Sequence, residues 1–273
     1  MISQALHQKI QTYIETNVGI QLPEHKRSLI ESRLVKRQKI LQFVSLEAYV
    51  EHAISEHSDE TLEFIDALTT NKTNFFREQA HFDFIQSFIS ERSSFANKTL
   101  HVWCAGCSSG EEAYTLGIIL SELVEQGLIS DYRIDATDIS KSSLIAAASA
   151  LYHEGDIAPI SESRRKKYLL RGINQAKGTF KLVKSIRKRI SFESFNLVCT
   201  KLNRPRHYDI ILCRNVMIYF GAEQRTRLVD QFWQQLTPNG LFFVGHSEGI
   251  TNLRSKFKQV VAAGYQKLGD KSA

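Results

Sequence analysis

The stretch LHVWCAGCSSGEEAYTLG, residues 100–117, indicates how the larger part of the chain folds. It begins with an apolar run, passes through a loop that holds Gly106 and Gly110, and continues into a segment that starts with two glutamates. A strand, a glycine-bearing loop and a helix in this order are typical of a doubly wound α/β sheet. The loop matches neither G-x-G-x-x-G nor G-x-x-x-x-G-K-[ST], so a nucleotide triphosphate is disfavoured.

Further short apolar runs follow along the chain, separated by helical segments. They are YRIDATD, RISFESFN, YDIILC, GLFFVG and a last one near QVVAAGYQKL. Strands that alternate with helices predict a mainly parallel sheet with helices on both faces. We therefore predict a doubly wound, Rossmann-like α/β sheet from about Ser93 to the C-terminus.

Two regions do not follow this alternation. The first seventy or so residues show few strand signals, and Ile2, Leu6, Ile10 and Ile14 recur every four residues, which predicts helices. Residues 171–193 contain glycine turn signals and the alternating stretch TFKLVKSIRKRI, which predicts a small antiparallel hairpin or meander. We therefore expect a helical N-terminal domain and a small antiparallel β-subdomain inserted into the sheet domain.

The positive charge is concentrated in two segments. The net charge is +6, and residues 164–189 hold eleven Lys or Arg and no acidic residue. The second segment is predicted to be helical and carries Lys26, Arg27, Arg33, Lys36, Arg37 and Lys39. Each segment alone is typical of a solvated face, but the two together favour an acidic macromolecular partner.

Other classes of protein are disfavoured by the composition. No run approaches 18 apolar residues and the N-terminus lacks a signal-peptide core, so we expect a cytoplasmic protein without membrane insertion. Cys104 and Cys107 form a lone C-x-x-C without a second pair, which favours buried thiols. The histidines show no metal-ligand spacing, so no metal site is expected.

The string GHSEG, residues 245–249, matches the G-x-S-x-G turn of serine hydrolases. Such an enzyme needs an acid and then a histidine further along the chain, and no histidine follows Gly249. We therefore interpret the string as a tight turn after an apolar run, and Ser247 is not expected to be a nucleophile.

Polar residues follow several of the predicted strands, where ligands of open α/β sheets bind. Asp138 ends the second run in the position of an acid that binds ribose hydroxyls, although turn or cap residues also occur there. Arg214, Asn215 and Tyr219 follow the run YDIIL. Glu111 at the start of the predicted helix is explained equally well by a functional role and by a favourable interaction with the helix dipole. TTNKTNFFRE, residues 69–78, either covers the ligand site or is a linker anchored by its two phenylalanines.

Taken together, these motifs resemble the CheR family of chemotaxis receptor methyltransferases. The matching stretches are RSLIESRLVKR, TTNKTNFFRE, VWCAGCSSGEEAYTLG, ATDIS, FNL, CRNVMIYF and GLFFVGHSE, and they span almost the whole chain. The resemblance implies an enzyme that uses S-adenosylmethionine to esterify glutamate side chains of chemoreceptors, with S-adenosylhomocysteine as product. It implies a helical domain at residues 1–75, a methyltransferase domain at 76–273 and the inserted β-subdomain at 171–193.

The resemblance also implies a set of site residues. The cofactor-binding candidates that it implies are Asn71, Thr73, Arg77, Glu112, Asp138, Asn196, Leu197, Arg214 and Asn215, and Gly106 joins them because a glycine in the loop lets the backbone approach a ligand closely. Arg77 and Tyr219 are the candidates nearest to the reacting atoms, and GHSEG becomes a strand-end motif of the family. Ala113 stands where many members have proline, and this departure touches no proposed ligand.

The implied partner is the cytoplasmic part of a chemoreceptor. The basic N-terminal helix is the expected contact surface, the β-subdomain is a second candidate, and the protein is expected to act as a monomer. Two alternatives stay open: methylation of RNA or DNA by the same fold, and a signalling scaffold without activity. The basic segments lack an aromatic stacking motif, which argues against nucleic acid.

Overall fold

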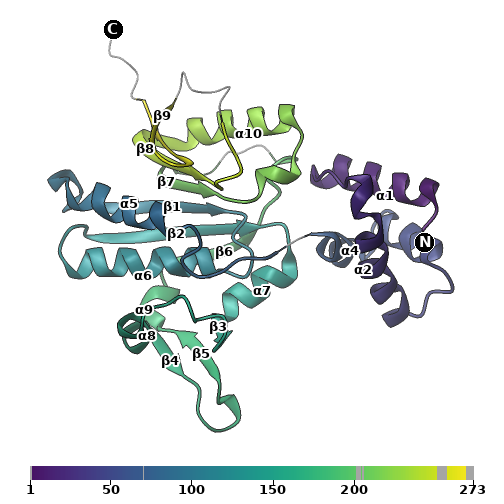
Figure 1. The fold of residues 1–273 in the computed structure, drawn as a ribbon, viewed down its shortest axis with the longest axis horizontal. Coiled ribbons are helices and arrows are strands. Elements are labelled where there is room, and N and C mark those ends of the chain that lie inside the picture. The colour runs from purple at the N-terminus through teal and green to yellow at the C-terminus, as the bar shows by residue number, and fades with distance from the viewer. Residues whose placement is uncertain (1, 70, 201–203, 205, 251–256, 269–273) are drawn as a thin grey trace.

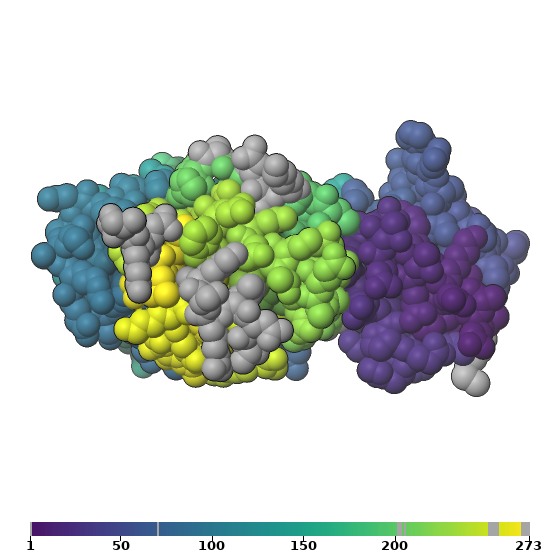
Figure 2. All heavy atoms as spheres, turned by 90° about the horizontal axis from the view of Figure 1, so that it is seen from above, coloured from purple at the N-terminus to yellow at the C-terminus, as the bar shows by residue number. Residues whose placement is uncertain are grey.

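The computed structural model describes residues 2–69, 71–200, 204, 206–250 and 257–268. A group of N-terminal helices lies beside a larger α/β domain (Figure 1). Figure 2 shows these helices as a lobe at one end of the molecule. None of the helices in the described ranges is long and apolar enough to cross a membrane.

The N-terminal lobe is helical, as predicted. It contains α1 (Gln4–Val18), η1 (Glu24–Lys26), α2 (Arg27–Ile40), α3 (Leu46–Ile54) and α4 (Thr61–Leu68). Ile2, Leu6, Ile10 and Ile14 all lie in the buried core of this lobe, because residues four apart share one face of a helix. Ser45 caps α3, since its side chain accepts a hydrogen bond from the N–H of Ala48 at 3.0 Å.

The larger domain is built on a sheet with the strand order β6-β2-β1-β7-β8-β10-β9. Its strands are β1 (Thr99–Ala105), β2 (Asp131–Asp138), β6 (Ile190–Ser194), β7 (Tyr208–Cys213), β8 (Leu236–Val244), β9 (Phe257–Val261) and β10 (Gly264–Lys267). Neighbouring strands from β6 through β8 in this order pair in parallel. β10 pairs antiparallel with both β8 and β9. The predicted doubly wound sheet is therefore confirmed, but the last predicted strand is a hairpin of two strands.

Helices cover both faces of this sheet (Figure 1). They include α5 (Gln79–Ser90), α6 (Glu111–Glu125), α7 (Lys141–Ser149) and α10 (Ala222–Gln235), and short turns occur at η2 (Ser93–Phe95) and η4 (Met217–Tyr219). Val102 and Cys104 of β1 pack in one core cluster with α5 and α6. Trp103 and Ala105 pack in the other with α10. Burial on both faces explains why the parallel strands are continuous apolar runs.

A small antiparallel sheet with the order β3-β5-β4 lies at the edge of the domain. It is formed by β3 (Leu151–His153), β4 (Leu169–Arg171) and β5 (Thr179–Leu182), with α8 (Glu162–Tyr168), η3 (Asn174–Ala176) and α9 (Lys184–Arg187) beside them. The expected hairpin is formed by β4 and β5, so it begins before residue 171. The stretch after β5 is not a second strand, because residues 184–187 form a helical turn and Ile190–Ser194 joins the main sheet.

Candidate active site

The candidate active site is a cavity that lies where the strand order reverses. β1 is flanked by β2 on one side and β7 on the other, and ligands of doubly wound sheets bind beyond the carboxyl ends of such strands. The cavity encloses about 1240 Å³, including the part open to solvent, which is ample for a cofactor. Its wall includes every predicted site residue: Asn71, Thr73, Arg77, Gly106, Glu112, Asp138, Asn196, Leu197, Arg214, Asn215 and Tyr219.

The loop after β1 approaches the cavity with its backbone. Gly106 has φ +88°, and its N–H donates to the carbonyl of Thr137 at 2.8 Å. A Cβ at Gly106 would lie 2.3 Å from Cγ2 of Val216, so a side chain has no room there. Glycine is required at this position both for the left-handed backbone and for the close contact with the loop after β7. Cys104 and Cys107 beside this loop are buried thiols, as predicted, and burial raises the pKa of both.

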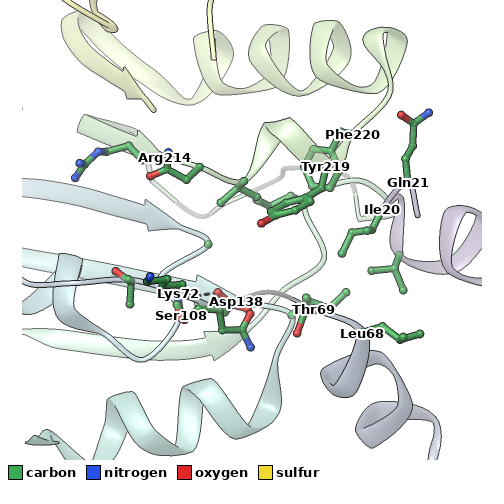
Figure 3. Close-up of a pocket in the computed structure, with 18 of the residues that line it drawn as sticks. Ile20, Gln21, Leu68, Thr69, Lys72, Ser108, Asp138, Arg214, Tyr219 and Phe220 are labelled. Atoms are coloured by element: carbon green, nitrogen blue, oxygen red, sulfur yellow. Dashed lines mark hydrogen bonds between the residues drawn. The ribbon is translucent and has the colours of Figure 1, made fainter. Parts of the chain in front are cut away.

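Asp138 lies at the end of β2 and faces the cavity (Figure 3). Its Oδ2 accepts from the N–H of Ser108 at 2.7 Å, and its Oδ1 accepts from the N–H of Ser140 at 2.9 Å. Burial raises the pKa of Asp138, and these N–H groups limit the rise. Each oxygen has a second lone pair, so the carboxylate can fix two loops and also accept from a ligand hydroxyl.

Arg214 at the end of β7 is held inside the protein. Its Nη1 lies 3.0 Å from Oε2 of Glu112, and its Nη2 lies 3.1 Å from Oε2 of Glu78. Nη2 also donates to the carbonyl of Arg77. The side chain is 2% exposed, and Figure 3 shows its guanidinium pointing away from Asp138 and Tyr219. The guanidinium therefore positions other groups, and we name this set of Arg214, Glu78 and Glu112 the Arg214 network.

The two acids of the Arg214 network differ. Burial raises the pKa of Glu112 more than the attraction of Arg214 lowers it. Burial also acts on Glu78, but there Arg214 and the N–H of His246 prevail and lower the pKa. Of the two acids, Glu78 is therefore the one whose ionised form its surroundings favour. Sequence analysis did not identify Glu78, although it is the last residue of TTNKTNFFRE.

The segment between the lobes, residues 71–78, lines the cavity, which agrees with the interpretation that it covers the ligand site. The Nδ2 of Asn71 donates to Oγ of Ser140 at 3.0 Å, and the carbonyl of Asn71 accepts from Oγ of Ser108 at 2.8 Å. Arg77 is half-buried, and its Nη1 lies 3.1 Å from the carbonyl of Lys72. Thr70 of this motif lies outside the described residues. The two phenylalanines, Phe75 and Phe76, are buried, so the segment is also anchored in the core.

Asn196 and Leu197 come from the loop after β6. The Nδ2 of Asn196 donates to the carbonyl of Asn17 at 2.9 Å, and its Oδ1 accepts from the N–H groups of Val198 and Cys199 at 2.9 and 3.1 Å. The amide of Asn196 thus joins this loop to the end of α1. Leu197 is buried and gives the cavity an apolar wall.

Residues of the N-terminal lobe complete the wall, and sequence analysis missed them. Ile20, Gln21 and Lys26 line the cavity opposite the sheet (Figure 3 labels the first two). The N–H of Gln21 donates to the carbonyl of Tyr219 at 2.8 Å, and Nζ of Lys26 lies 5.4 Å from the centre of the Tyr219 ring. These residues belong to no recognisable motif, so only the fold reveals their position.

The GHSEG string has a structural role that rests on its glutamate. Glu248 is 4% exposed, and its Oε2 accepts from the N–H groups of Asn215 at 2.6 Å and Gly245 at 2.7 Å. Its Oε1 accepts from the N–H of Ile218 at 3.0 Å. Glu248 thereby fixes the loop that carries Asn215, which has φ +60°. Ser247 is exposed at the turn.

The basic N-terminal segment is less exposed than its composition suggests. Arg37 makes a two-pronged ion pair with Glu60, with Nε–Oε1 at 2.8 Å and Nη2–Oε2 at 2.7 Å. Arg33 donates to the carbonyl of Thr69 at 2.7 Å, and Arg27 donates to the carbonyl of Ile2. Of the six basic residues in this segment, Lys36 and Lys39 are exposed.

The second basic segment is divided in the same way. Arg164 pairs with Glu122 at 2.8 Å, Arg189 pairs with Asp131 at 2.6 Å, and Lys167 pairs with Glu125. The exposed side chains of the small sheet and its loops include Arg171, Lys177, Lys184 and Lys188.

Comparison with known proteins gives consistent matches. The family described as "CheR methyltransferase, SAM binding domain" matches residues 71–265, and "CheR methyltransferase, all-alpha domain" matches residues 7–69. A chemotaxis protein methyltransferase of Borreliella burgdorferi is 34% identical over 262 residues, which cover 93% of this chain and 91% of that protein. Those of Salmonella typhimurium and Escherichia coli are 33% and 32% identical, with 94% of this chain and 88% of each relative covered.

Proposed function

This chain belongs to the CheR methyltransferase family and is an S-adenosylmethionine-dependent methyltransferase of chemotaxis, and we propose that its methyl acceptors are glutamate side chains of chemoreceptors. The product is then a glutamate methyl ester. The observation that carries the proposal is the convergence of the predicted site residues, from five separate stretches of sequence, on one cavity at the switch point of the sheet.

The residues of the cavity suit S-adenosylmethionine. Gly106 lets the backbone come close to a ligand, and Asp138 offers carboxylate lone pairs to ribose hydroxyls. Leu197 offers an apolar surface, and Asn71, Thr73, Glu112 and Asn215 supply polar groups along the wall. The guanidinium of Arg214 acts through Glu112, which it orients. Bound here, S-adenosylmethionine supplies an electrophilic methyl group on a sulfonium.

The acceptor needs little activation by the protein. A glutamate side chain has a pKa of about 4.3, so it is an ionised nucleophile at neutral pH and no general base is required. What the protein must supply is orientation, which contributes roughly 7–11 kcal/mol when reacting atoms are held in line. A catalytic histidine is therefore not needed, and the described residues of the cavity wall include none.

Arg77 and Tyr219 are our candidates for holding the acceptor carboxylate. Both line the cavity, Arg77 from the segment between the lobes and Tyr219 from η4. Arg77 attracts and orients the carboxylate, and the Tyr219 hydroxyl donates a hydrogen bond to it. A tight ion pair would reduce the nucleophilicity of the carboxylate, so the proposed role of Arg77 is positioning.

The exposed lysines and arginines provide the docking surface for an acidic receptor helix bundle. Lys36 and Lys39 on α2 and the exposed basic side chains of the small sheet are the candidates. Exposed charge pairs contribute about 0.2–1 kcal/mol each, so docking is fast, weak and salt-sensitive. We further propose that the protein works as a monomer in the cytoplasm, where the methylated part of the receptors lies.

The test is transfer of labelled methyl from S-adenosylmethionine to chemoreceptor-containing membranes, followed by mild alkali. Carboxyl methyl esters are hydrolysed under these conditions and N-methyl groups are not. We expect alkali-labile label on the receptor, and we expect less of it as salt is raised. Absence of such label from a preparation that binds the cofactor would contradict glutamate esterification and favour a nucleic-acid substrate or a scaffold role.

A further inference from the structure

A group of three side chains that could bind a metal shares Glu78 with the Arg214 network. Glu78 precedes α5, His81 lies in the first turn of α5, and His246 follows β8. One oxygen of the glutamate and one nitrogen of each imidazole all lie within 4.8 Å of one another. His81 is fully buried, Glu78 is half-buried and His246 is exposed, so the group is open to solvent on one side.

The hydrogen bonding of His81 fixes which nitrogen faces the group. Its Nε2 lies 2.8 Å from the carbonyl oxygen of Ala262, and a carbonyl only accepts, so Nε2 carries the proton. Nδ1 therefore presents a lone pair. This atom is buried and has no hydrogen-bond partner among the described residues. A buried acceptor without a partner is costly and requires an explanation.

The neighbour of that lone pair is a carboxylate oxygen. Nδ1 of His81 lies 3.6 Å from Oε2 of Glu78, which is too long for a hydrogen bond. With Nε2 bonded to the carbonyl of Ala262, Nδ1 faces this oxygen without a hydrogen bond between them. Two acceptor atoms thus face each other in the interior, and a cation between them satisfies both.

We propose that Glu78, His81 and His246 form a binding site for a divalent transition-metal ion, with Zn²⁺ as the best fit. Two nitrogens and one oxygen are ligands that Zn²⁺ accepts, and three protein ligands leave a fourth position for water. Two ligands each about 2.1 Å from a tetrahedral ion are roughly 3.4 Å apart, which is close to the observed separation of Glu78 and His81. The hydrogen bond from Nε2 to Ala262 orients the buried imidazole as in known metal sites.

The charges around the site allow a cation but limit its affinity. Arg214 repels it, whereas the carboxyl groups of Glu78 and Glu112 attract it. Glu78 Oε2 accepts from both Nε and Nη2 of Arg214, at 3.3 and 3.1 Å, so a metal at this oxygen shares it with the guanidinium. The cation and Arg214 then share the carboxylate of Glu78. The metal therefore lies next to Arg214, which with Glu112 lines the proposed cofactor site.

The first experiment is titration of the full-length, chelator-stripped protein with Zn²⁺ in competition with a chromophoric chelator. We expect one ion per chain. His246→Ala removes an exposed ligand without disturbing the core, and we expect it to weaken binding roughly 10-fold or more. His52→Ala, which removes an exposed histidine of α3, should bind as the unsubstituted protein does. Equal affinity of His246→Ala and the unsubstituted protein would overturn the proposal.

A second experiment distinguishes this site from the cysteines. Co²⁺ bound by imidazole and carboxylate gives visible d–d absorption without strong thiolate charge transfer in the near ultraviolet. We also expect Zn²⁺ to raise the unfolding temperature of the unsubstituted protein more than that of His246→Ala. A strong thiolate band, or no stoichiometric binding, would show that these residues are not a metal site. Neither readout depends on methyl transfer, so the result is independent of the proposed function.

Discussion

Each part of the molecule holds an arginine network, and the two differ in burial, because Arg214 is buried whereas Arg37 is partly exposed. In the N-terminal lobe, Arg37 and Tyr49 both bond to Glu60. In the α/β domain, Arg214 is shared between Glu78 and Glu112. The first network joins helices of the N-terminal lobe beside Tyr49 of its core, whereas two members of the second, Arg214 and Glu112, line the cavity.

The comparison shows that the place of a charged residue in the sequence does not reveal its target. Arg37 was predicted to belong to a basic docking surface, and Arg214 was predicted to bind the cofactor. Arg37 pairs with Glu60, and Arg214 pairs with Glu78 and Glu112, so each charge is balanced within the protein. The functional charge is to be sought on residues such as Arg77, which is half-buried at the cavity.

Loss of Arg214 should have the largest effect. Arg214→Ala leaves two acidic groups inside the protein without their cation, and we expect the free energy of unfolding to fall by about 3–5 kcal/mol. Arg214→Lys keeps the charge but not the two-pronged geometry, so its loss should be smaller. Urea unfolding measures both. A loss below about 1 kcal/mol for the alanine variant would mean that the network is not buried as described.

Glu60→Gln should destabilise the N-terminal lobe by about 2–3 kcal/mol at neutral pH, less than a fully buried pair, because Arg37 is 26% exposed. Burial opposes ionisation of Glu60, but Arg37 and Tyr49 lower its pKa below 4.5 overall. The contribution is therefore present above pH 4.5 and is lost as the pH falls through the folded-state pKa.

Urea unfolding of both proteins from pH 7 to pH 3 tests this account of Glu60. The difference in stability between the unsubstituted protein and Glu60→Gln should shrink as the pH falls below 4.5. Cofactor affinity at neutral pH serves as the control and should not change. A stability difference that stays constant over this range would rule out the proposed linkage.

Arg77→Ala should affect the rate rather than the stability. We expect methyl transfer at saturating cofactor to fall about 10- to 100-fold, equivalent to about 1.4–2.7 kcal/mol. The free energy of unfolding should change by less than about 0.5 kcal/mol. Comparison of kcat with urea unfolding for the same variant separates the two effects. An unchanged kcat would remove Arg77 from the proposed mechanism.

Asp138→Asn tests the carboxylate at the end of β2. The amide nitrogen of asparagine must face one of two backbone N–H donors, from Ser108 or Ser140, and one acceptor for the cofactor is weakened. We expect the dissociation constant of S-adenosylmethionine to rise about 10-fold, or about 1.4 kcal/mol. Calorimetric titration measures this change. Unaltered affinity would mean that Asp138 is a turn or cap residue and does not bind the cofactor.

Tyr219→Phe should have the smallest effect, because the ring and its contact with Lys26 are retained. Loss of one hydrogen bond to the acceptor corresponds to about 1 kcal/mol, or roughly fivefold in kcat. Cofactor affinity should stay the same, and steady-state kinetics with saturating cofactor shows whether it does. If the variant lost cofactor affinity instead, Tyr219 would be a wall of the cofactor pocket and not a contact of the acceptor.

The parallel sheet and the strand-end residues could be predicted from the sequence because their signals are local. A buried parallel strand is a continuous apolar run, and the glycines and acids after it mark the switch point. The small sheet was harder, because β3 and β4 have three residues each and show no periodicity. Its predicted start therefore fell too late in the chain.

The missed residues depend on contacts between distant segments. Gln21 and Lys26 line the cavity only because the N-terminal lobe packs against η4. Glu248 was visible inside GHSEG, but its three backbone donors come from the turn itself and from the loop after β7. His81 and His246 are too far apart in the sequence to show a ligand spacing.

The hydrogen bond between Gln21 and Tyr219 has a thermodynamic consequence. Because both lobes contribute to the cavity wall, a bound cofactor stabilises each of them by mass action, including the helical lobe that contributes none of the sheet. In the presence of the cofactor, the two lobes should therefore melt as one cooperative unit. Cofactor supply should then raise the stability of the helical lobe, which carries part of the proposed docking surface.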